Sequence, residues 1–207
     1  MSLLDISRFI ATGMPNWPGD TPTEFKQVAS IAGGYSANVG RLTMSVHSGS
    51  HTDAPYHYSD TGAKIDEVPL DTYVGPAVVV DVIGHATLTP DLFAAIDLGA
   101  TPRVLFKTNS WPDAAVFPPT WPVIDLALPG WLAARGVKLI GLDFPSVDER
   151  HSKDLPVHHA CLAAGLIIIE NLNLRDAAPG VYDLIALPLK IRGGDGSPVR
   201  AALRARS

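Results

Sequence analysis

Three histidines and one aspartate lie within eleven residues of this chain, in the segment HSGSHTDAPYH at positions 47–57. They are His47, His51, Asp53 and His57, and the whole chain contains only seven histidines. Imidazole nitrogens and carboxylate oxygens together suit zinc or manganese, so the segment is predicted to bind a metal ion. The alternative is a surface loop whose histidines bind no metal.

The residues between His47 and His51 limit how the backbone can bring the two rings together. A helix is unfavourable because Ser-Gly-Ser fills positions 48–50 and Pro55 follows shortly after. A straight strand also fails, since four residues of strand span ~13 Å, while ligands of one zinc ion each lie about 2.0–2.1 Å from it. The chain is therefore predicted to turn at 48–50 and to carry His51 and Asp53 on a folded-back loop.

The element before this turn is predicted to be a half-buried strand at 39–46, because apolar residues alternate there with polar ones. An unbroken apolar run at 77–82 indicates a strand buried on both faces. Strands and short helices alternate along the chain, which predicts a single mixed α/β domain over residues 1–207. The other strands are expected at 3–9, 25–31, 103–108, 137–143, 166–169, 183–190 and 197–204, and helices at 89–99, 125–135 and 156–165.

Two residues outside the histidine-rich segment are further candidates. Glu170 ends the apolar strand expected at 166–169, and a buried carboxylate is costly without a partner. It is predicted either to bind metal or to reach solvent or a basic side chain. Trp17 lies in the proline-rich loop 14–22, where it either forms a pocket wall or packs the loop onto the core. The aromatic residues of loop 110–122 leave a choice between a substrate entrance, a partner subunit and internal packing.

Composition limits the class of protein. Hydrophobic residues make up 46% of the 207 residues, enough for one full core. The formal net charge of −5 gives no reason to expect binding to nucleic acid or an anionic membrane, and no apolar run approaches the ~20 residues of a membrane span. Cys161 is the single cysteine and the first ten residues lack a basic leader, so a reducing cytoplasm is expected.

Several of these segments resemble the metal-dependent cyclase/hydrolase family, whose best-known members are the bacterial kynurenine formamidases. Segment 47–57 matches the family signature His-x-Gly-x-His-x-Asp-x-Pro-x-His, with Ser50 where Thr is commoner. The resemblance extends along nearly the whole chain, through NWPGD (16–20), HHACLAAGLIIIENL (158–172), LIALPLK (184–190) and SPVRAALR (197–204).

The resemblance implies a site for two metal ions, usually Zn²⁺, with Mn²⁺ as the alternative. The first ion would be bound by His47, His51 and Asp53. The second ion would be bound by Asp53, which would bridge the two ions, together with Glu170 and a histidine of the segment HHACLAAGLIIIENL at 158–172, called the second block below. His158 and His159 both stand in that block, and His158 matches the family spacing of twelve residues before the glutamate and seven before the glycine.

Two further residue roles follow from the resemblance. His57 would transfer protons, and Trp17 would line the substrate pocket. The implied fold is a small mixed α/β domain with a curved, mixed sheet core and short flanking helices, and the members of this family are usually homodimers.

The implied reaction is hydrolysis of N-formyl-L-kynurenine to L-kynurenine and formate in tryptophan degradation. A rival within the family is a hydrolase that opens a cyclic imide, a lactone or an isatin-like ring. A rival of another class is a metal-binding protein without turnover. Formate release from formylkynurenine separates the first two, and metal binding without hydrolysis would indicate the third.

Overall fold

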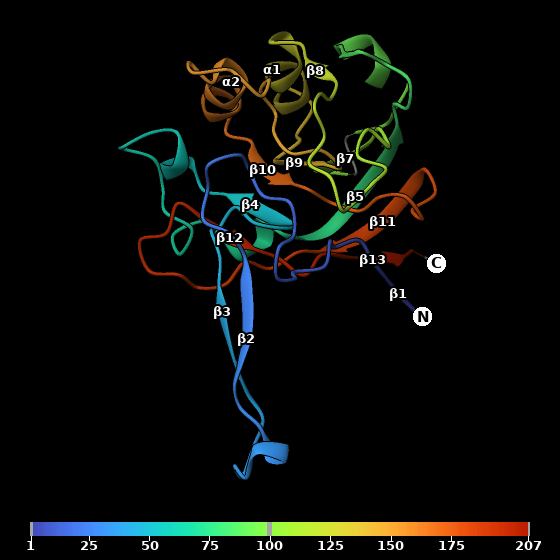
Figure 1. Ribbon diagram of the computed structural model, residues 1–207. Helices are drawn as coiled ribbons and strands as arrows, with labels where there is room; N and C mark the ends of the chain where they lie inside the picture. Colours follow the sequence, from blue (N-terminus) through green and yellow to red (C-terminus); the bar gives the residue numbers. More distant parts are fainter. Residues whose placement is uncertain (1, 99–100, 207) are drawn as a thin grey trace.

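A curved mixed sheet of nine strands forms the centre of the protein, as seen in a computed structural model that describes residues 2–98 and 101–206 (Figure 1). Within this sheet the pairs β5–β7, β7–β9 and β9–β10 are parallel. The other neighbouring strands pair antiparallel. This arrangement confirms the predicted mixed α/β fold. The strand order is β1 (Leu3–Asp5), β13 (Ala202–Ala205), β11 (Gly180–Ile185), β5 (Val74–Asp81), β7 (Arg103–Lys107), β9 (Leu139–Leu142), β10 (Ile167–Glu170), β4 (His51–Asp53) and β12 (Gly196–Pro198).

Two short helices, α1 (Ala127–Ala133) and α2 (Pro156–Ala164), cover one face of the sheet, and side chains of the opposite face form a second core (Figure 1). The apolar run in β5 contributes to both cores, because Val78 and Val80 pack toward the helices and Val79 packs on the other side. Burial of this strand on both faces is therefore confirmed. No helix within residues 2–98 and 101–206 has the length and apolar character needed to cross a membrane.

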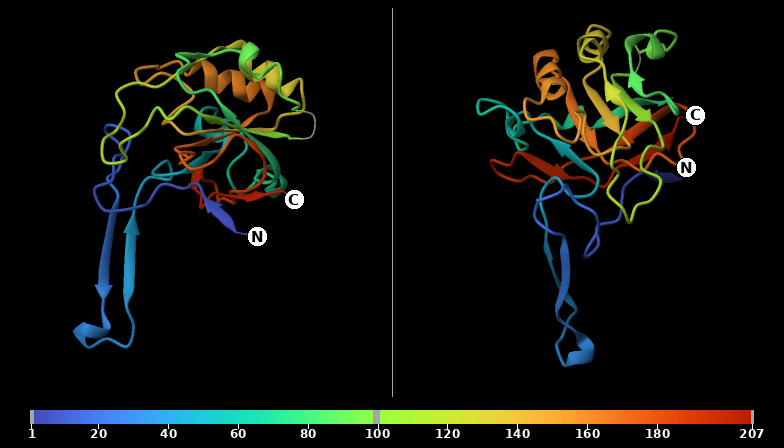
Figure 2. Two further views of the ribbon diagram at one scale, coloured as in Figure 1. Left: turned by 90° about the vertical axis from the view of Figure 1, so that its right-hand side faces the viewer. Right: turned by 45° about the horizontal axis from the view of Figure 1, so that its top comes forward.

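The hairpin of β2 (Glu24–Ala29) and β3 (Val39–Thr43) projects away from the rest of the molecule (Figures 1 and 2). Every residue of β3 is exposed, so the prediction of a half-buried strand at 39–46 was wrong. Alternation of apolar and polar residues gives the period of a strand, but it does not say whether another layer covers its apolar side. Here β3 pairs with β2 in a separate two-stranded sheet.

Two other predicted elements differ from the structure. The helix expected at 89–99 is a single 3-10 turn at Pro90–Phe93, whose Thr89 side chain does not cap it; Gly99 lies outside the described residues. The strand expected at 197–204 divides into β12 and β13, which pair at opposite ends of the strand order. Residues 199–201 span between them, because Val199 N donates to Ser50 O while Ala201 O accepts from Ile6 N.

The remaining short elements complete the description. A second two-stranded sheet pairs β6 (Thr87–Leu88) with β8 (Val123–Ile124) in parallel. Three further 3-10 turns are η1 (Ile31–Gly33), η2 (Pro55–His57) and η3 (Leu70–Thr72).

Candidate metal centre

Strand β4 carries the centre of the site. The chain turns before it as expected, with Ser48 N donating to Ser45 O at 3.1 Å and Gly49 at a φ of +66°. That left-handed conformation favours glycine. His51 and Asp53 then lie in β4 itself, so the predicted folded-back loop is in fact a short strand. It is buried between β10 and β12 because its backbone pairs with both.

Strand pairing brings together residues that are distant in the sequence. In the antiparallel ladder Glu170 of β10 faces His51, and Gly196 of β12 faces Asp53. His158 reaches the same place from α2, where it is 3% exposed. Its neighbour His159 is exposed. The two histidines point to different sides of one helix, as a period of 3.6 residues requires.

Asp53 is the shared partner of three histidines. Its Oδ1 lies 3.0 Å from His47 Nδ1 and 3.4 Å from His51 Nε2. Its Oδ2 lies 3.5 Å from His158 Nε2. Glu170 completes the group, since its Oε2 is 3.5 Å from His51 Nε2 and its Oε1 is 3.9 Å from His158 Nε2. Asp53 is 1% exposed and Glu170 4%.

The far nitrogens of two of these histidines are held by other acceptors. His51 Nδ1 donates to the carbonyl oxygen of Gly49 at 3.0 Å. His158 Nδ1 donates to the Asp148 carboxylate at 2.7 Å, and that carboxylate also accepts from the backbone N–H groups of Val157 and His158. A proton on Nδ1 leaves the Nε2 lone pair of each ring directed at carboxylate oxygens. The lone pairs of these nitrogens and the negative carboxylate oxygens repel one another unless a metal cation or bound protons lie between them.

The spacing of these atoms fits a metal ion. Two ligand atoms that each lie about 2.0–2.1 Å from a tetrahedral ion are roughly 3.3 Å from one another, and most of the separations above are between 3.0 and 3.5 Å. Among the described residues, three overlapping groups have ligand atoms close enough to hold an ion: His47 with His51 and Asp53, Asp53 with His158 and Glu170, and His47 with His57 and Asp195. Of these three groups, only the first two share the buried carboxylate of Asp53. Imidazole and carboxylate donors in this mixture suit zinc or manganese.

The pKa shifts of the metal-free cluster reflect the same demand for positive charge. Burial opposes ionisation of Asp53, but the neighbouring histidines outweigh it and hold the pKa of Asp53 well below its ordinary value. Burial, reinforced by the charge on Asp53, raises the pKa of Glu170 well above its ordinary value. Burial also opposes charge on His158, yet its bonds to Asp148 and Asp53 raise its pKa to about 10. Carboxylates act on His47 in the same way, and its pKa also rises to about 10.

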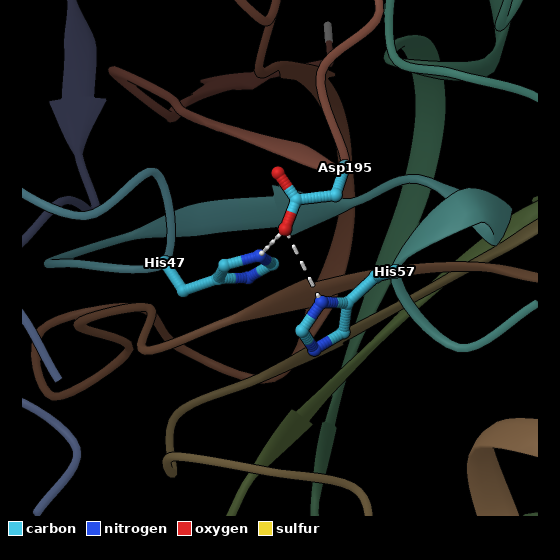
Figure 3. Close-up of side chains that lie close together, drawn as sticks. All are labelled: His47, His57 and Asp195. Carbon is cyan, nitrogen blue, oxygen red and sulfur yellow. Dashed lines mark hydrogen bonds and ion pairs between the residues drawn. The ribbon is translucent and has the colours of Figure 1, made fainter. Parts of the chain in front are cut away.

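A third group of side chains lies beside the first two. Asp195, from the turn before β12, has Oδ2 at 3.0 Å from His47 Nε2 and 3.5 Å from His57 Nδ1 (Figure 3). The rings of His47 and His57 lie with centroids 4.0 Å apart. The bond from His47 lowers the pKa of Asp195 to about 2, whereas burial lowers the pKa of His57. His57 therefore favours the neutral form that can accept a proton.

Several of these polar groups line a cavity of about 290 Å³, just below the roughly 300–1,000 Å³ range of small-molecule sites. Trp17, Trp111 and Phe117 line it together with His47, His51, His57, His158 and Glu170. Trp17 packs edge-on against Phe117 at 5.7 Å between ring centroids. Trp17 is thus both a cavity wall and part of an aromatic cluster, so both sequence interpretations describe it.

The structure brings His47, His51, Asp53, His57, His158, Glu170 and Trp17 to one place, and it leaves the alternative candidate His159 exposed on another side of α2. Sequence reasoning missed Asp148 and Asp195, which contact the ring nitrogens of His158 and His47. Asp148 lies in the charged segment Asp148-Glu149-Arg150, and nothing in its local sequence shows that it caps a helix eight residues away. Asp195 stands in the glycine-rich segment Gly193-Gly194-Asp195-Gly196, which by itself indicates only a turn. The one available signal was an acidic residue enclosed by glycines.

Comparison with known protein families gives a match over most of the chain. Residues 4–149 match the family described as "Putative cyclase". The kynurenine formamidase of Geobacillus thermodenitrificans (strain NG80-2) is 43% identical over 201 residues, which cover 97% of this chain and 96% of that protein. The kynurenine formamidase of Salinibacter ruber (strain DSM 13855 / M31) is 46% identical over 213 residues, covering 99% and 98%.

Solved structures share the fold over its whole length. One described as a potential metal-dependent hydrolase with cyclase activity has a TM-score of 0.83 and 31% identity, covering 100% of this chain and 98% of its own. Isatin hydrolase A from Ralstonia solanacearum has a TM-score of 0.82 and 25% identity, covering 99% and 92%.

Proposed function

Because this chain belongs to the putative cyclase family, we propose that it is a metal-dependent arylformamidase that hydrolyses N-formyl-L-kynurenine to L-kynurenine and formate, a step of tryptophan degradation. Its main support is the convergence of three histidines and two carboxylates at the base of an aromatic-walled cavity. The two kynurenine formamidases at 43% and 46% identity over nearly the full length direct the choice of substrate.

In this proposal His47, His51 and Asp53 bind one zinc ion, and Asp53, His158 and Glu170 bind a second, with Mn²⁺ as the alternative metal. Divalent ions held there would polarise the formyl carbonyl and lower the pKa of water. The chain's own contribution is to hold these donors in place. Glu170 Oε1 accepts from the backbone N–H of Val147 at 3.1 Å. This bond helps to hold the carboxylate in place at the end of β10, which flanks β4 on the side opposite β12.

His57 is the proposed proton-transfer residue. Its Nδ1 faces Asp195, so Nε2 is the nitrogen left to exchange protons in the cavity. Burial keeps the pKa of the ring below its ordinary value, and the neutral ring can accept a proton at neutral pH. The leaving group is an aryl amine that departs poorly as an anion, so return of that proton to the leaving nitrogen assists cleavage. Such a transfer is typically worth about 10²–10⁴-fold in rate.

The aromatic walls define where the substrate's ring would lie. Trp17, Trp111 and Phe117 present apolar surface on the rim of the cavity, and their mutual packing at 5.6–5.7 Å between centroids keeps them in place. An aryl ring stacked there would direct its formamide toward His57 and Asp53. We also propose a homodimer, as the family resemblance implies, and a reducing cytoplasm, as the single cysteine indicates.

Hydrolysis of an isatin-like ring is the second candidate, and the similarity to isatin hydrolase A favours it. Both reactions hydrolyse an amide bond whose nitrogen is attached to an aromatic ring, so the same polar groups could serve either reaction. A metal-binding protein without turnover is the third candidate.

One experiment separates the three candidates. Purified protein is analysed for metal content and then assayed with N-formyl-L-kynurenine, isatin and an aliphatic lactone. Formate release from formylkynurenine, lost after metal removal and restored by zinc or manganese, is the expected result. Turnover of isatin alone would replace the proposed substrate with the second candidate. Bound metal with no turnover of any of the three compounds would refute an enzymatic role in this family's chemistry.

A further inference from the structure

Asp195 contacts two histidines of the cavity through one oxygen atom. Its Oδ2 is 3.0 Å from His47 Nε2 and 3.5 Å from His57 Nδ1, and Figure 3 shows both rings approaching this carboxylate from the same side. Neither the histidine-rich segment nor the second block contains it. It comes from the glycine-rich turn before β12, which is 148 residues from His47 in the chain.

The bond to His47 determines which nitrogen of that ring is available. A carboxylate can only accept, so His47 Nε2 carries the hydrogen that Asp195 accepts. Nδ1 donates in the same way to Asp53 Oδ1 at 3.0 Å in the metal-free protein. It lies on the side of the proposed first metal group, so it is the nitrogen that would give up its hydrogen to a metal ion. The same arrangement occurs at His158, where Asp148 accepts from Nδ1 and Nε2 faces Asp53. Carboxylates that hold the remote nitrogen of a ligand histidine fix its tautomer and ring orientation.

The backbone around Asp195 is built for this contact. Its carbonyl oxygen accepts from Ala54 N at 2.9 Å, which joins the turn to the chain just after Asp53. A Cβ at Gly196 would lie 2.8 Å from His47 Cε1 and 3.0 Å from the Thr52 carbonyl oxygen. Only glycine at 196 lets the His47 ring lie so close to the turn. The carboxylate is thus held in register with β4 and does not depend on a mobile side chain alone.

His57 is the second ring that this carboxylate faces. With Nδ1 facing Asp195, His57 keeps Nε2 free for proton transfer, as a histidine does beside the aspartate of a catalytic pair, except that the Asp195 side chain is 43% exposed. The His57 ring lies against the His47 ring at 4.0 Å between centroids and a tilt of 36°, so one carboxylate contacts two rings that also contact each other.

We propose that Asp195 is a positioning residue. It orients His47 toward the metal group by accepting from Nε2, and it orients His57 toward the substrate through the approach of its carboxylate to Nδ1 at 3.5 Å. This inference rests on the proposed function for the roles of the two histidines. It adds to that function a carboxylate that couples metal binding to proton transfer.

The test compares Asp195→Ala, Asp195→Asn and Asp66→Ala with the wild type. Zn²⁺ affinity is measured by competition with a chromophoric chelator in the absence of substrate, and kcat and KM are measured at saturating Zn²⁺. Loss of such an orienting group typically costs about 10–100-fold in metal affinity or activity. Asp195→Ala should lose that much in Zn²⁺ affinity, and its kcat should fall while KM changes little. Asp195→Asn keeps an acceptor oxygen and should recover part of the affinity.

Asp66→Ala is the matched control, because Asp66 Oδ1 accepts from Gly193 N at 2.9 Å and so supports the same turn without contacting either ring. It should lower the melting temperature without changing Zn²⁺ affinity. Equal affinity losses in Asp66→Ala and Asp195→Ala would overturn the inference by assigning the effect to the turn. Unchanged affinity in Asp195→Ala would overturn the role at His47, and unchanged kcat the role at His57. A wild type that binds Zn²⁺ but leaves formylkynurenine intact would refute the proposed substrate, while the affinity comparison would still decide the role of Asp195.

Discussion

Replacing His57 with alanine should separate catalysis from metal binding and from stability. The His57 side chain is 33% exposed, and its closest polar contact is Asp195 at 3.5 Å. A contact of this kind contributes about 1 kcal/mol or less to folding. Loss of a proton-transfer group costs about 10²–10⁴-fold in rate, which corresponds to about 2.7–5.4 kcal/mol in the activation barrier at 1.36 kcal/mol per power of ten. The effect on kcat should therefore exceed the effect on stability severalfold.

The assay measures metal stoichiometry, turnover and the free energy of unfolding for His57→Ala, His158→Ala and His159→Ala, all prepared alike. His57→Ala should retain both metal ions and lose most of its turnover. His158 is 3% exposed and faces Asp53 and Glu170, so His158→Ala should lose metal as well as activity. His159 is exposed on the same helix, and its replacement should change neither.

Three results would contradict this reasoning. Loss of metal in His57→Ala would make that residue a ligand and leave the proton-transfer role without a candidate. Undiminished kcat in His57→Ala would remove the role altogether. Metal loss in His159→Ala but not in His158→Ala would show that the exposed histidine is the ligand and that the orientation of α2 is misassigned.

Four further outcomes are expected. A chelator should abolish turnover, and zinc or manganese should restore it; full activity in protein shown to be metal-free by elemental analysis would exclude the proposed mechanism. Metal binding should release protons, because the carboxylates hold the pKa values of His47 and His158 at about 10, so both rings are protonated at pH 7 in the metal-free protein and must lose a proton to bind metal. Metal affinity should therefore rise with pH up to about that value. Calorimetry in buffers of different ionisation enthalpy measures the number of protons released, and no release on metal binding would contradict this prediction. Trp17→Ala should raise KM by roughly 10–100-fold with metal content unchanged, because the lost apolar side chain is worth about 1.5–3 kcal/mol. The control is Trp131→Ala on α1, which lies outside the cavity lining and should leave KM unaltered. Gly196→Ala should destabilise the protein by about 1–3 kcal/mol and weaken Zn²⁺ binding, because its Cβ would press on the His47 ring; normal Zn²⁺ affinity in that variant would mean that the ring moves freely.

The central segment could be interpreted from sequence because its constraints are local. Three histidines and an aspartate within eleven residues restrict the backbone between them, and the glycine at 49 indicates where it must turn. The apolar run of β5 and the proline and glycine that bound α2 are also local signals, and each corresponds to an element close to its predicted position.

The fate of the strand before that segment could not be predicted in the same way. Residues 39–43 alternate as a half-buried strand does, yet they form one arm of an exposed hairpin. Whether an apolar face is covered depends on which part of the chain packs against it, and that is decided by the whole fold.

The amino-acid sequence alone predicted the donor types and the turn between His47 and His51, and the family resemblance added the choice of His158 by its spacing from Gly165 and Glu170. Only the tertiary structure decided which distant residues hold those donors in place. Asp148 and Asp195 contact the histidine rings because α2 packs over the sheet and β12 pairs with β4. The pairing of β12 with β4 joins segments more than a hundred residues apart. Asp148 is only ten residues from His158, but the path of the loop between them and the packing of α2 decide that their side chains meet. No local pattern of residue types specifies either contact.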